Sequence, residues 1–106
     1  MNTSVSILFY IKRAKANNLG VCPIYTRVTV NTKRFEFSTN KYINPDKWSS
    51  EGSKVKGSTE EARTINSHLD YLKSQVLEAE KKLFKKDISV TCENLKNELF
   101  GLSETK

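Results

Sequence analysis

Apolar and polar residues alternate between Cys22 and Thr39, a pattern that predicts two antiparallel strands joined by a two-residue turn at Asn31-Thr32. Because successive side chains of a strand point to opposite faces, the turn fixes the face on which each residue lies. The face suited to a core carries three cross-strand pairs: Val28 with Phe35, Thr26 with Phe37, and Ile24 with Thr39. The opposite, polar face carries three others: Thr29 with Arg34, Arg27 with Glu36, and Tyr25 with Ser38. We expect the function of the chain to reside on this polar and basic face.

An earlier segment, residues 4–13, predicts a further strand. Its β-branched side is assigned to the core: Val5, Ile7, Phe9 and Ile11. Residues 15–21 have the composition of a hairpin connection, so a meander of three antiparallel strands is the simplest topology. In that register Tyr10 and Lys12 lie beside the polar face of the following hairpin.

The segment after the third strand predicts a short helical turn, because Asn44 is a good N-cap and Pro45 suits the first helical position. The turn ends near Trp48, which we expect to plug the edge of the core. Residues 49–57 are rich in Ser, Gly and Lys, which predicts a flexible basic loop.

A long helix is predicted over residues 59–86, with Ser58 and Glu61 as a capping box. One helical face carries a sustained apolar seam: Ala62, Ile65, Leu69, Leu72, Val76, Ala79 and Leu83. A helix of this length, about 42 Å, overhangs a three-stranded sheet. A short helix over residues 92–100, capped by Thr91 and stopped by Gly101, supplies the cover for the overhang with Val90, Leu95, Leu99 and Phe100. The alternative is a coiled-coil dimer along the seam.

These elements predict an α+β domain, in which a three-stranded antiparallel sheet packs on one long helix and a short C-terminal helix follows. Residues 1–57 form the sheet and the Trp-containing loop, and residues 58–101 form the helices that complete the same domain. We expect residues 102–106 to begin a linker to further domains. The predicted core joins both parts: Ile7, Phe9, Ile11, Ile24, Val28, Phe35 and Phe37 with Ile65, Leu69 and Leu72.

The positive charge of the chain is concentrated in its first half. Residues 1–57 contain ten Lys and Arg against three acids, a net charge of +7, whereas residues 58–106 contain eight against nine, a net charge of −1. With 37% apolar and 28% charged residues the chain is an ordinary globular sequence, so segregation of charge favours an anionic partner. No apolar run reaches the ~20 residues that span a bilayer, and no export signal is evident, which predicts a cytoplasmic protein.

Residues for catalysis or metal binding are poorly represented. Cys22 and Cys92 lack metal-ligand spacing and are expected to be free thiols, and His68, the one histidine, is expected on the solvated surface of the long helix. No phosphate-binding loop, zinc motif or nucleophile motif is present. We therefore expect no catalytic residue, no metal and no cofactor in this chain.

A DNA-binding surface is predicted on the polar sheet face. Its candidate contacts are Tyr10, Lys12, Tyr25, Arg27, Thr29 and Arg34. Long cations reach phosphates, an arginine can read guanine in the major groove, and a small sheet fits that groove. Other lysines are candidates to clamp flanking phosphates: Lys33, Lys41, Lys54 and Lys56. The plainer interpretation is that Arg27 and Glu36 are an ordinary surface ion pair.

The ordered set of short motifs resembles a known family. The motifs are Phe9-Tyr10-Ile11-Lys12-Arg13, Pro23-Ile24-Tyr25 with Arg27-Val28-Thr29-Val30, Phe37-Ser38-Thr39, Ile43 with Pro45 and Trp48, Val55-Lys56-Gly57, and Ile65-Asn66. They are similar to the N-terminal arm-type DNA-binding domain of tyrosine recombinases (phage-integrase family) common in Bacteroides-type mobile elements. Thr32 departs from the glycine often found at that turn.

The resemblance implies a sheet docked in the major groove of double-stranded arm-type sites, within a bacterial site-specific recombinase whose catalytic domain lies elsewhere. It also implies a structural role for Asn66, bonded to the Trp48 segment. Two other functions stay open: a protein-interaction module that uses an exposed helix seam, and an RNA-binding sheet. We expect the isolated domain to be a monomer, with any multimeric assembly on DNA made through further domains.

Overall fold

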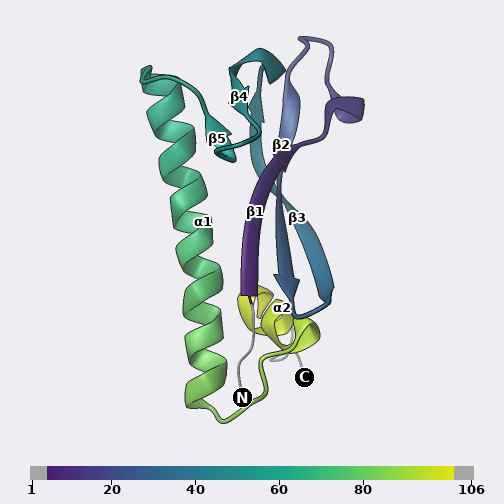
Figure 1. Ribbon diagram of the computed structural model, residues 1–106, viewed down its shortest axis with the longest axis vertical. Coiled ribbons are helices and arrows are strands. Elements are labelled where there is room, and N and C mark those ends of the chain that lie inside the picture. Colours follow the sequence, from purple (N-terminus) through teal and green to yellow (C-terminus); the bar gives the residue numbers. More distant parts are fainter. Residues whose placement is uncertain (1–4, 102–106) are drawn as a thin grey trace.

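The computed structural model describes residues 5–101, which form an antiparallel meander covered on one face by helices (Figure 1). The sheet has the order β1-β2-β3, with β1 at Val5–Ile11, β2 at Cys22–Val30 and β3 at Lys33–Ile43. The remaining elements are β4 (Trp48–Ser49), β5 (Lys54–Val55), α1 (Glu60–Lys85) and α2 (Cys92–Phe100). The predicted α+β fold is confirmed. The expected linker at residues 102–106 and the start of the first strand at Ser4 lie outside the described residues.

The register of the sheet follows from the alternation of side chains. Val28 pairs with Phe35 and Thr26 with Phe37, as predicted, and Tyr10 lies opposite Tyr25 on β1 and β2. Of the two residues in the β2–β3 turn, only Asn31 has a positive φ, 58°. Asparagine tolerates a positive φ, whereas a β-branched residue does not. Thr32 needs no positive φ in this turn, so it fits there without strain.

The predicted pair of Ile24 with Thr39 is wrong, because the ladder shifts register between Pro23 and Tyr25. Asn40, on β3 beside this irregularity, has a positive φ of 64°. The Thr39 hydroxyl instead donates a hydrogen bond of 2.8 Å to the carbonyl oxygen of Ile24. Both side chains remain buried, so the irregularity changes the pairing and keeps the faces.

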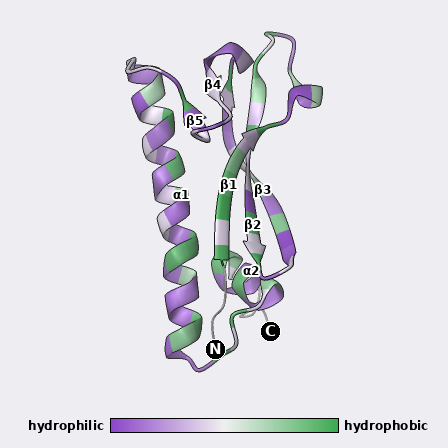
Figure 2. Cartoon of the chain, in the orientation of Figure 1, coloured by the Kyte–Doolittle hydropathy of each residue, from purple (hydrophilic) through white to green (hydrophobic). Residues whose placement is uncertain are grey.

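The core consists of two clusters that α1 connects. The Trp48 cluster comprises Phe9, Ile24, Ile43, Trp48, Val55, Ala62, Ile65 and Leu69. The hairpin-tip cluster comprises Val28, Val30, Phe35, Val76, Ala79, Leu83 and Leu95. Apolar segments recur along α1 between polar ones, as the seam requires (Figure 2). The predicted core is confirmed, with Ile7, Ile11, Phe37 and Leu72 partly buried at its margins.

Helix α1 begins one residue later than predicted. Thr59 is the N-cap, and its hydroxyl accepts a hydrogen bond of 3.1 Å from the Ala62 amide, so the expected capping by Ser58 is wrong. Serine and threonine are both good N-cap residues, so the sequence alone does not distinguish Ser58 from Thr59.

Helix α2 covers the overhanging part of α1, as predicted. Thr91 caps it and Gly101 ends it in the left-handed conformation, with φ of 70°. Leu95 is fully buried against the seam and Leu99 packs beside it. Phe100 was predicted to cover the seam of α1. Its ring instead packs on the rings of Phe35 and Phe37 of the sheet, with centroids 6.3 and 5.2 Å away.

Residues 49–57 form a short hairpin where a loop was expected, with turns at residues 50–53. Trp48 pairs with Val55 and Ser49 with Lys54 in a short two-stranded sheet. Asn66 on α1 holds this sheet, since its side chain accepts from the Val55 amide at 2.9 Å and donates to the Val55 carbonyl at 3.1 Å. Trp48 is 4% exposed and plugs the core as predicted. The structural role implied for Asn66 is thus confirmed, through the strand partner of Trp48.

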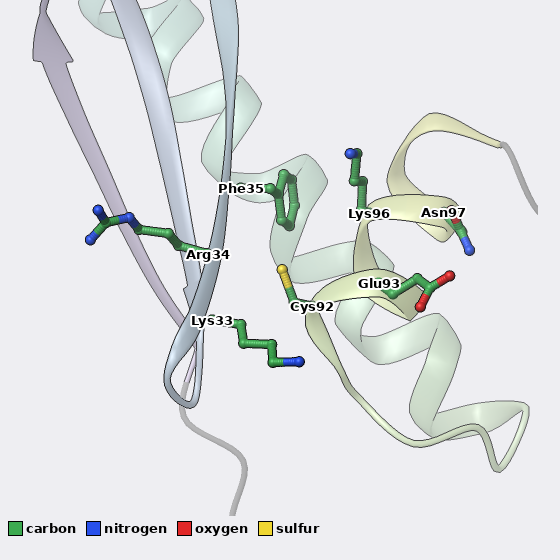
Figure 3. Close-up of a pocket in the computed structure, with 7 residues that line it drawn as sticks. All are labelled: Lys33, Arg34, Phe35, Cys92, Glu93, Lys96 and Asn97. Carbon is green, nitrogen blue, oxygen red and sulfur yellow. The ribbon is translucent and has the colours of Figure 1, made fainter.

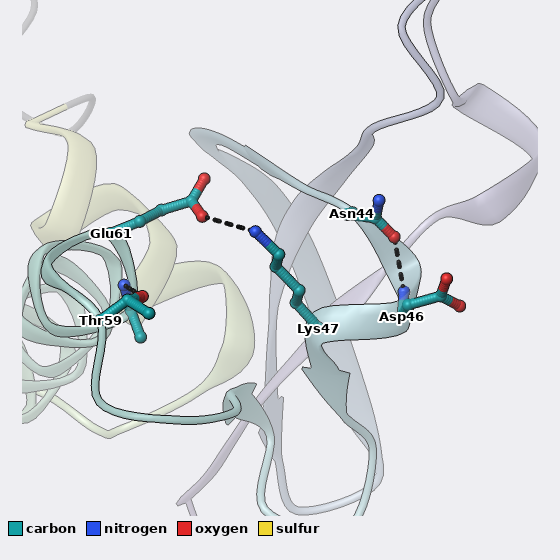
Figure 4. Close-up of polar contacts among 6 residues, drawn as sticks. Asn44, Asp46, Lys47, Thr59 and Glu61 are labelled. Atoms are coloured by element: carbon teal, nitrogen blue, oxygen red, sulfur yellow. Dashed lines mark hydrogen bonds and ion pairs between the residues drawn. The ribbon is translucent and has the colours of Figure 1, made fainter.

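The segment before β4 forms the predicted helical turn, and the structure shows how it is fastened to α1 (Figure 4). The Asn44 side chain accepts a hydrogen bond of 2.8 Å from the Asp46 amide. Lys47 then contacts Glu61 on α1, with 3.4 Å between nitrogen and oxygen.

The prediction that His68 lies on the solvated surface of the long helix is wrong. His68 is half-buried, and its Nε2 atom lies 3.2 Å from the carbonyl oxygen of Thr39, so it links α1 to β3.

Candidate nucleic-acid interface

The two faces of the three-stranded sheet have different surroundings. Both core clusters lie between one face and the helices, and we call the other the outer face. Three strands contribute its side chains, and the register groups them in rows. The rows are Ser6-Thr29-Arg34, Leu8-Arg27-Glu36 and Tyr10-Tyr25-Ser38. No strand or helix among residues 5–101 has a core contact on this side, which leaves it open to a partner.

Five side chains of the outer face form a compact group, the outer-face cluster: Tyr10, Lys12, Tyr25, Arg27 and Glu36. Arg27 Nε donates to Glu36 Oε2 at 2.8 Å, and Lys12 Nζ lies 3.6 Å from Glu36 Oε1. The guanidinium of Arg27 lies over the Tyr10 ring at 4.7 Å, and the Lys12 ammonium lies over the Tyr25 ring at 3.9 Å. The two tyrosine rings are 6.4 Å apart. Each cation is therefore held between an aromatic face and a shared carboxylate.

The cluster also perturbs the ionisation of its members. Hydrogen bonds from Tyr10 and Arg27 lower the pKa of Glu36 below its ordinary value. Partial burial, and then the hydrogen bond to Glu36, raise the pKa of Tyr10. The hydrogen bond to Glu36 raises the pKa of Arg27. The cluster contains two basic side chains, Lys12 and Arg27, against the single carboxylate of Glu36, and this excess of positive charge suits an anionic ligand.

The row at the hairpin tip extends this surface. Arg34 points away from α2, on the opposite side of β3 from Phe35 (Figure 3). Thr29 lies opposite Arg34 and is half-buried. Thr29 and Arg34 thus lie on the same face of the sheet as the outer-face cluster.

The Arm DNA-binding domain family matches residues 9–96 of the chain. The chain belongs to this family. The predicted resemblance to the arm-type domain of phage integrases is confirmed, and the arm domain is a DNA-binding domain. Searches of the curated proteins and of the solved structures found no significant match. None of the helices that the structure describes is long and apolar enough to cross a membrane.

Six of the ten DNA-contact candidates lie together on the outer face of the arm domain: Tyr10, Lys12, Tyr25, Arg27, Thr29 and Arg34. Two others lie toward the helices. Lys33 follows the turn on the side of α2 and lines a groove with Phe35 and Cys92 (Figure 3). Lys41 is half-buried and alternates with exposed Tyr42, which puts it on the side of the buried Ile43.

Lys54 and Lys56 belong to the β4–β5 hairpin and its continuation. Lys54 lines a hollow with Phe9 and Leu69, on the helix side of the sheet. The Lys56 amide donates to the carbonyl oxygen of Lys47 at 2.7 Å. The arm domain therefore does not bring these two lysines together with the outer-face cluster.

Leu8 is an apolar residue of the outer face that the sequence analysis did not select as a DNA contact. Leu8 is 42% exposed and lies opposite Arg27 in the β1–β2 register. Alternation along β1 placed Leu8 on the polar face, but an apolar residue was not selected as a DNA contact. Apolar side chains do contact thymine methyl groups, so residue chemistry and face together were the available signal.

Within residues 5–101, no group of three or more His, Cys, Asp and Glu side chains is arranged to hold a metal ion. Cys22 is buried and Cys92 half-buried, both as free thiols.

Proposed function

We propose that the outer face of this arm domain binds double-stranded DNA sequence-specifically, in the major groove of arm-type sites. In this proposal the domain is the N-terminal part of a tyrosine-type site-specific recombinase, and catalysis is the work of other domains. The observation that carries it is the grouping of six candidate contacts on one open sheet face of a DNA-binding family.

The dimensions of the sheet support docking in the major groove. Neighbouring strands lie about 4.8 Å apart, so the backbones of three strands span about 10 Å. The major groove of B-DNA is about 12 Å wide and admits a small β-sheet edge or ribbon. Each of the three strands carries polar side chains on the outer face, so each strand can contribute to the contact.

Arg27 is the candidate for a base contact. It lies in the central strand and the central row, between Leu8 and Glu36. A guanidinium can donate two parallel hydrogen bonds to O6 and N7 of guanine. Arg34 and Lys12 lie toward opposite ends of the same face and are the candidates for phosphate contacts.

The protein-interaction alternative lacks the surface that it requires. That alternative needs an exposed helix seam, yet Ile65, Leu69 and Val76 are buried by the sheet and α2. The RNA alternative needs exposed aromatic rings on which unpaired bases can stack. The rings of Tyr10 and Tyr25 are half-buried, with Arg27 and Lys12 lying over them, so this alternative is disfavoured.

Selection from a pool of random 20-base-pair DNA duplexes tests the proposal. We expect one sequence motif to be enriched and to bind more tightly than a scrambled duplex of the same composition. An RNA duplex of the selected sequence serves as competitor and should displace little DNA. Failure to enrich any motif, or equal competition by the RNA duplex, would overturn sequence-specific reading of the DNA major groove.

A further inference from the structure

A carboxylate at the centre of the outer face needs an explanation if that face meets DNA. Glu36 lies in the same row as Arg27, and its side chain is 27% exposed. A negative charge there repels phosphates, and a surface selected only for affinity to DNA would not keep it. The following inference rests on the proposed function and concerns the selectivity of the same face.

The contact from Glu36 uses a particular edge of the Arg27 guanidinium. Glu36 Oε2 takes the Nε hydrogen at 2.8 Å, which leaves the two terminal amino groups for another partner. The Tyr10 ring supports the flat side of the same guanidinium at 4.7 Å. An arginine held on one edge and one face loses less conformational entropy when it binds a base edge.

The second oxygen of Glu36 acts on Lys12. The Lys12 ammonium lies 3.6 Å from Glu36 Oε1 while it also lies over the Tyr25 ring. A lysine that shares a carboxylate attracts phosphate less strongly than a free one, so binding to DNA of any sequence is weakened.

We propose that Glu36 is the selectivity-determining residue of the outer face: it positions Arg27 for a base edge and offsets Lys12, so that phosphates alone bind weakly. The carboxylate thus lowers affinity for all DNA and raises the preference for the correct site. Selectivity is a difference between two affinities, and a repulsive group can supply it.

Glu36→Gln tests this, because glutamine keeps an oxygen for Arg27 Nε and removes the charge that offsets Lys12. Affinities are measured for the selected duplex and for its scrambled counterpart at two salt concentrations. We expect Glu36→Gln to bind the scrambled duplex about two- to fivefold more tightly. Its salt slope should steepen by about one unit, since one further phosphate contact becomes available. The preference for the selected duplex should fall accordingly.

Glu36→Ala and Glu78→Gln complete the set. Glu36→Ala also removes the oxygen that holds Arg27, so its preference for the selected duplex should fall below that of Glu36→Gln. Glu78 is exposed on α1, and Glu78→Gln makes the same change in net charge away from the outer face. An unchanged preference in Glu36→Gln, or an equal change in Glu78→Gln, would overturn the role of Glu36. If the unaltered domain prefers no duplex, the proposed function itself fails, and this is known before any Glu36 variant is measured.

Discussion

Asn66 and Val55 are joined by two hydrogen bonds, so that the side chain of a helix residue completes the edge of a two-residue strand. The bonds measure 2.9 and 3.1 Å and are partly buried. They fix the β4–β5 hairpin, and with it Trp48, against α1.

Replacement of Asn66 by alanine should therefore destabilise the domain. Both the amide and the carbonyl of Val55 lose their partner, at a cost of about 1–3 kcal/mol in the free energy of unfolding. Urea unfolding followed by Trp48 fluorescence measures the loss. Ser67→Ala, at the exposed neighbouring position, is the control and should be close to neutral. Equal stability of the two variants would mean that the hairpin is held by packing alone.

Two phenylalanines provide a matched test of the core assignment. Phe35 is 8% exposed and Phe84 is 81% exposed. Phe35→Ala should cost about 3–5 kcal/mol, a large share of the stability of a small domain, whereas Phe84→Ala should cost little. Thermal unfolding by circular dichroism distinguishes them. A small effect of Phe35→Ala would mean that the sheet faces are reversed, and the proposed DNA contacts would then be wrong as well.

Arg27→Ala should lower affinity for the selected duplex by about 1–3 kcal/mol and relax base preference at one position. Arg27→Lys keeps the charge without the planar fork, so it should retain the salt slope and still lose that preference. Lys54→Ala, on the helix side of the sheet, should leave both quantities unchanged. Titrations against selected and scrambled duplexes provide the readout. An equal loss on both duplexes for Arg27→Ala would make Arg27 a phosphate contact.

The stability of the domain should depend on the ionisation of Glu36 in acid. Its pKa in the folded state lies below the ordinary value of 4.5, so the folded protein binds fewer protons than the unfolded chain near that pH. The stabilisation is therefore fully present above about pH 5 and is lost as the pH falls through the folded-state pKa. Comparison of the parent protein with Glu36→Gln from pH 7 to pH 3 should show a stability difference that shrinks in acid. A difference that stays constant over this range would contradict the assignment.

The domain should sediment as a monomer as its concentration rises, because the sheet and α2 bury the seam of α1. A dimer that persists at low concentration and dissociates on Phe84→Asp would instead identify the exposed side of α1 as an interface.

Several features of the fold were predictable because local chemistry determines them. The alternation of residues around the turn at residues 31 and 32 set the pairing of Val28 with Phe35, and Thr91 and Gly101 marked both ends of α2. The six outer-face candidates followed from the same alternation, since face membership needs only the strand period.

Other features depend on tertiary contacts that leave no local trace. The irregularity that separates Ile24 from Thr39 leaves the alternation of buried and exposed residues on β3 intact, so the sequence pattern does not reveal it. Strands β4 and β5 are too short to show the two-residue alternation of a strand. They are held by Asn66, which lies 11 residues beyond Val55 on α1. For the same reason, charge alone did not reveal that Lys54 lies across the sheet from Arg27.

Both core clusters include residues of α1, so a substitution that destabilises one cluster should also affect the other. The helix contributes Ile65 to the Trp48 cluster and Val76 to the hairpin-tip cluster, and Ile7 packs against both. We therefore expect the two ends of the domain to unfold together, so that the outer face is either assembled or lost. A core variant should consequently lower the fraction of molecules that can bind DNA without altering the affinity of each folded molecule. A stabilising osmolyte should then restore its DNA binding.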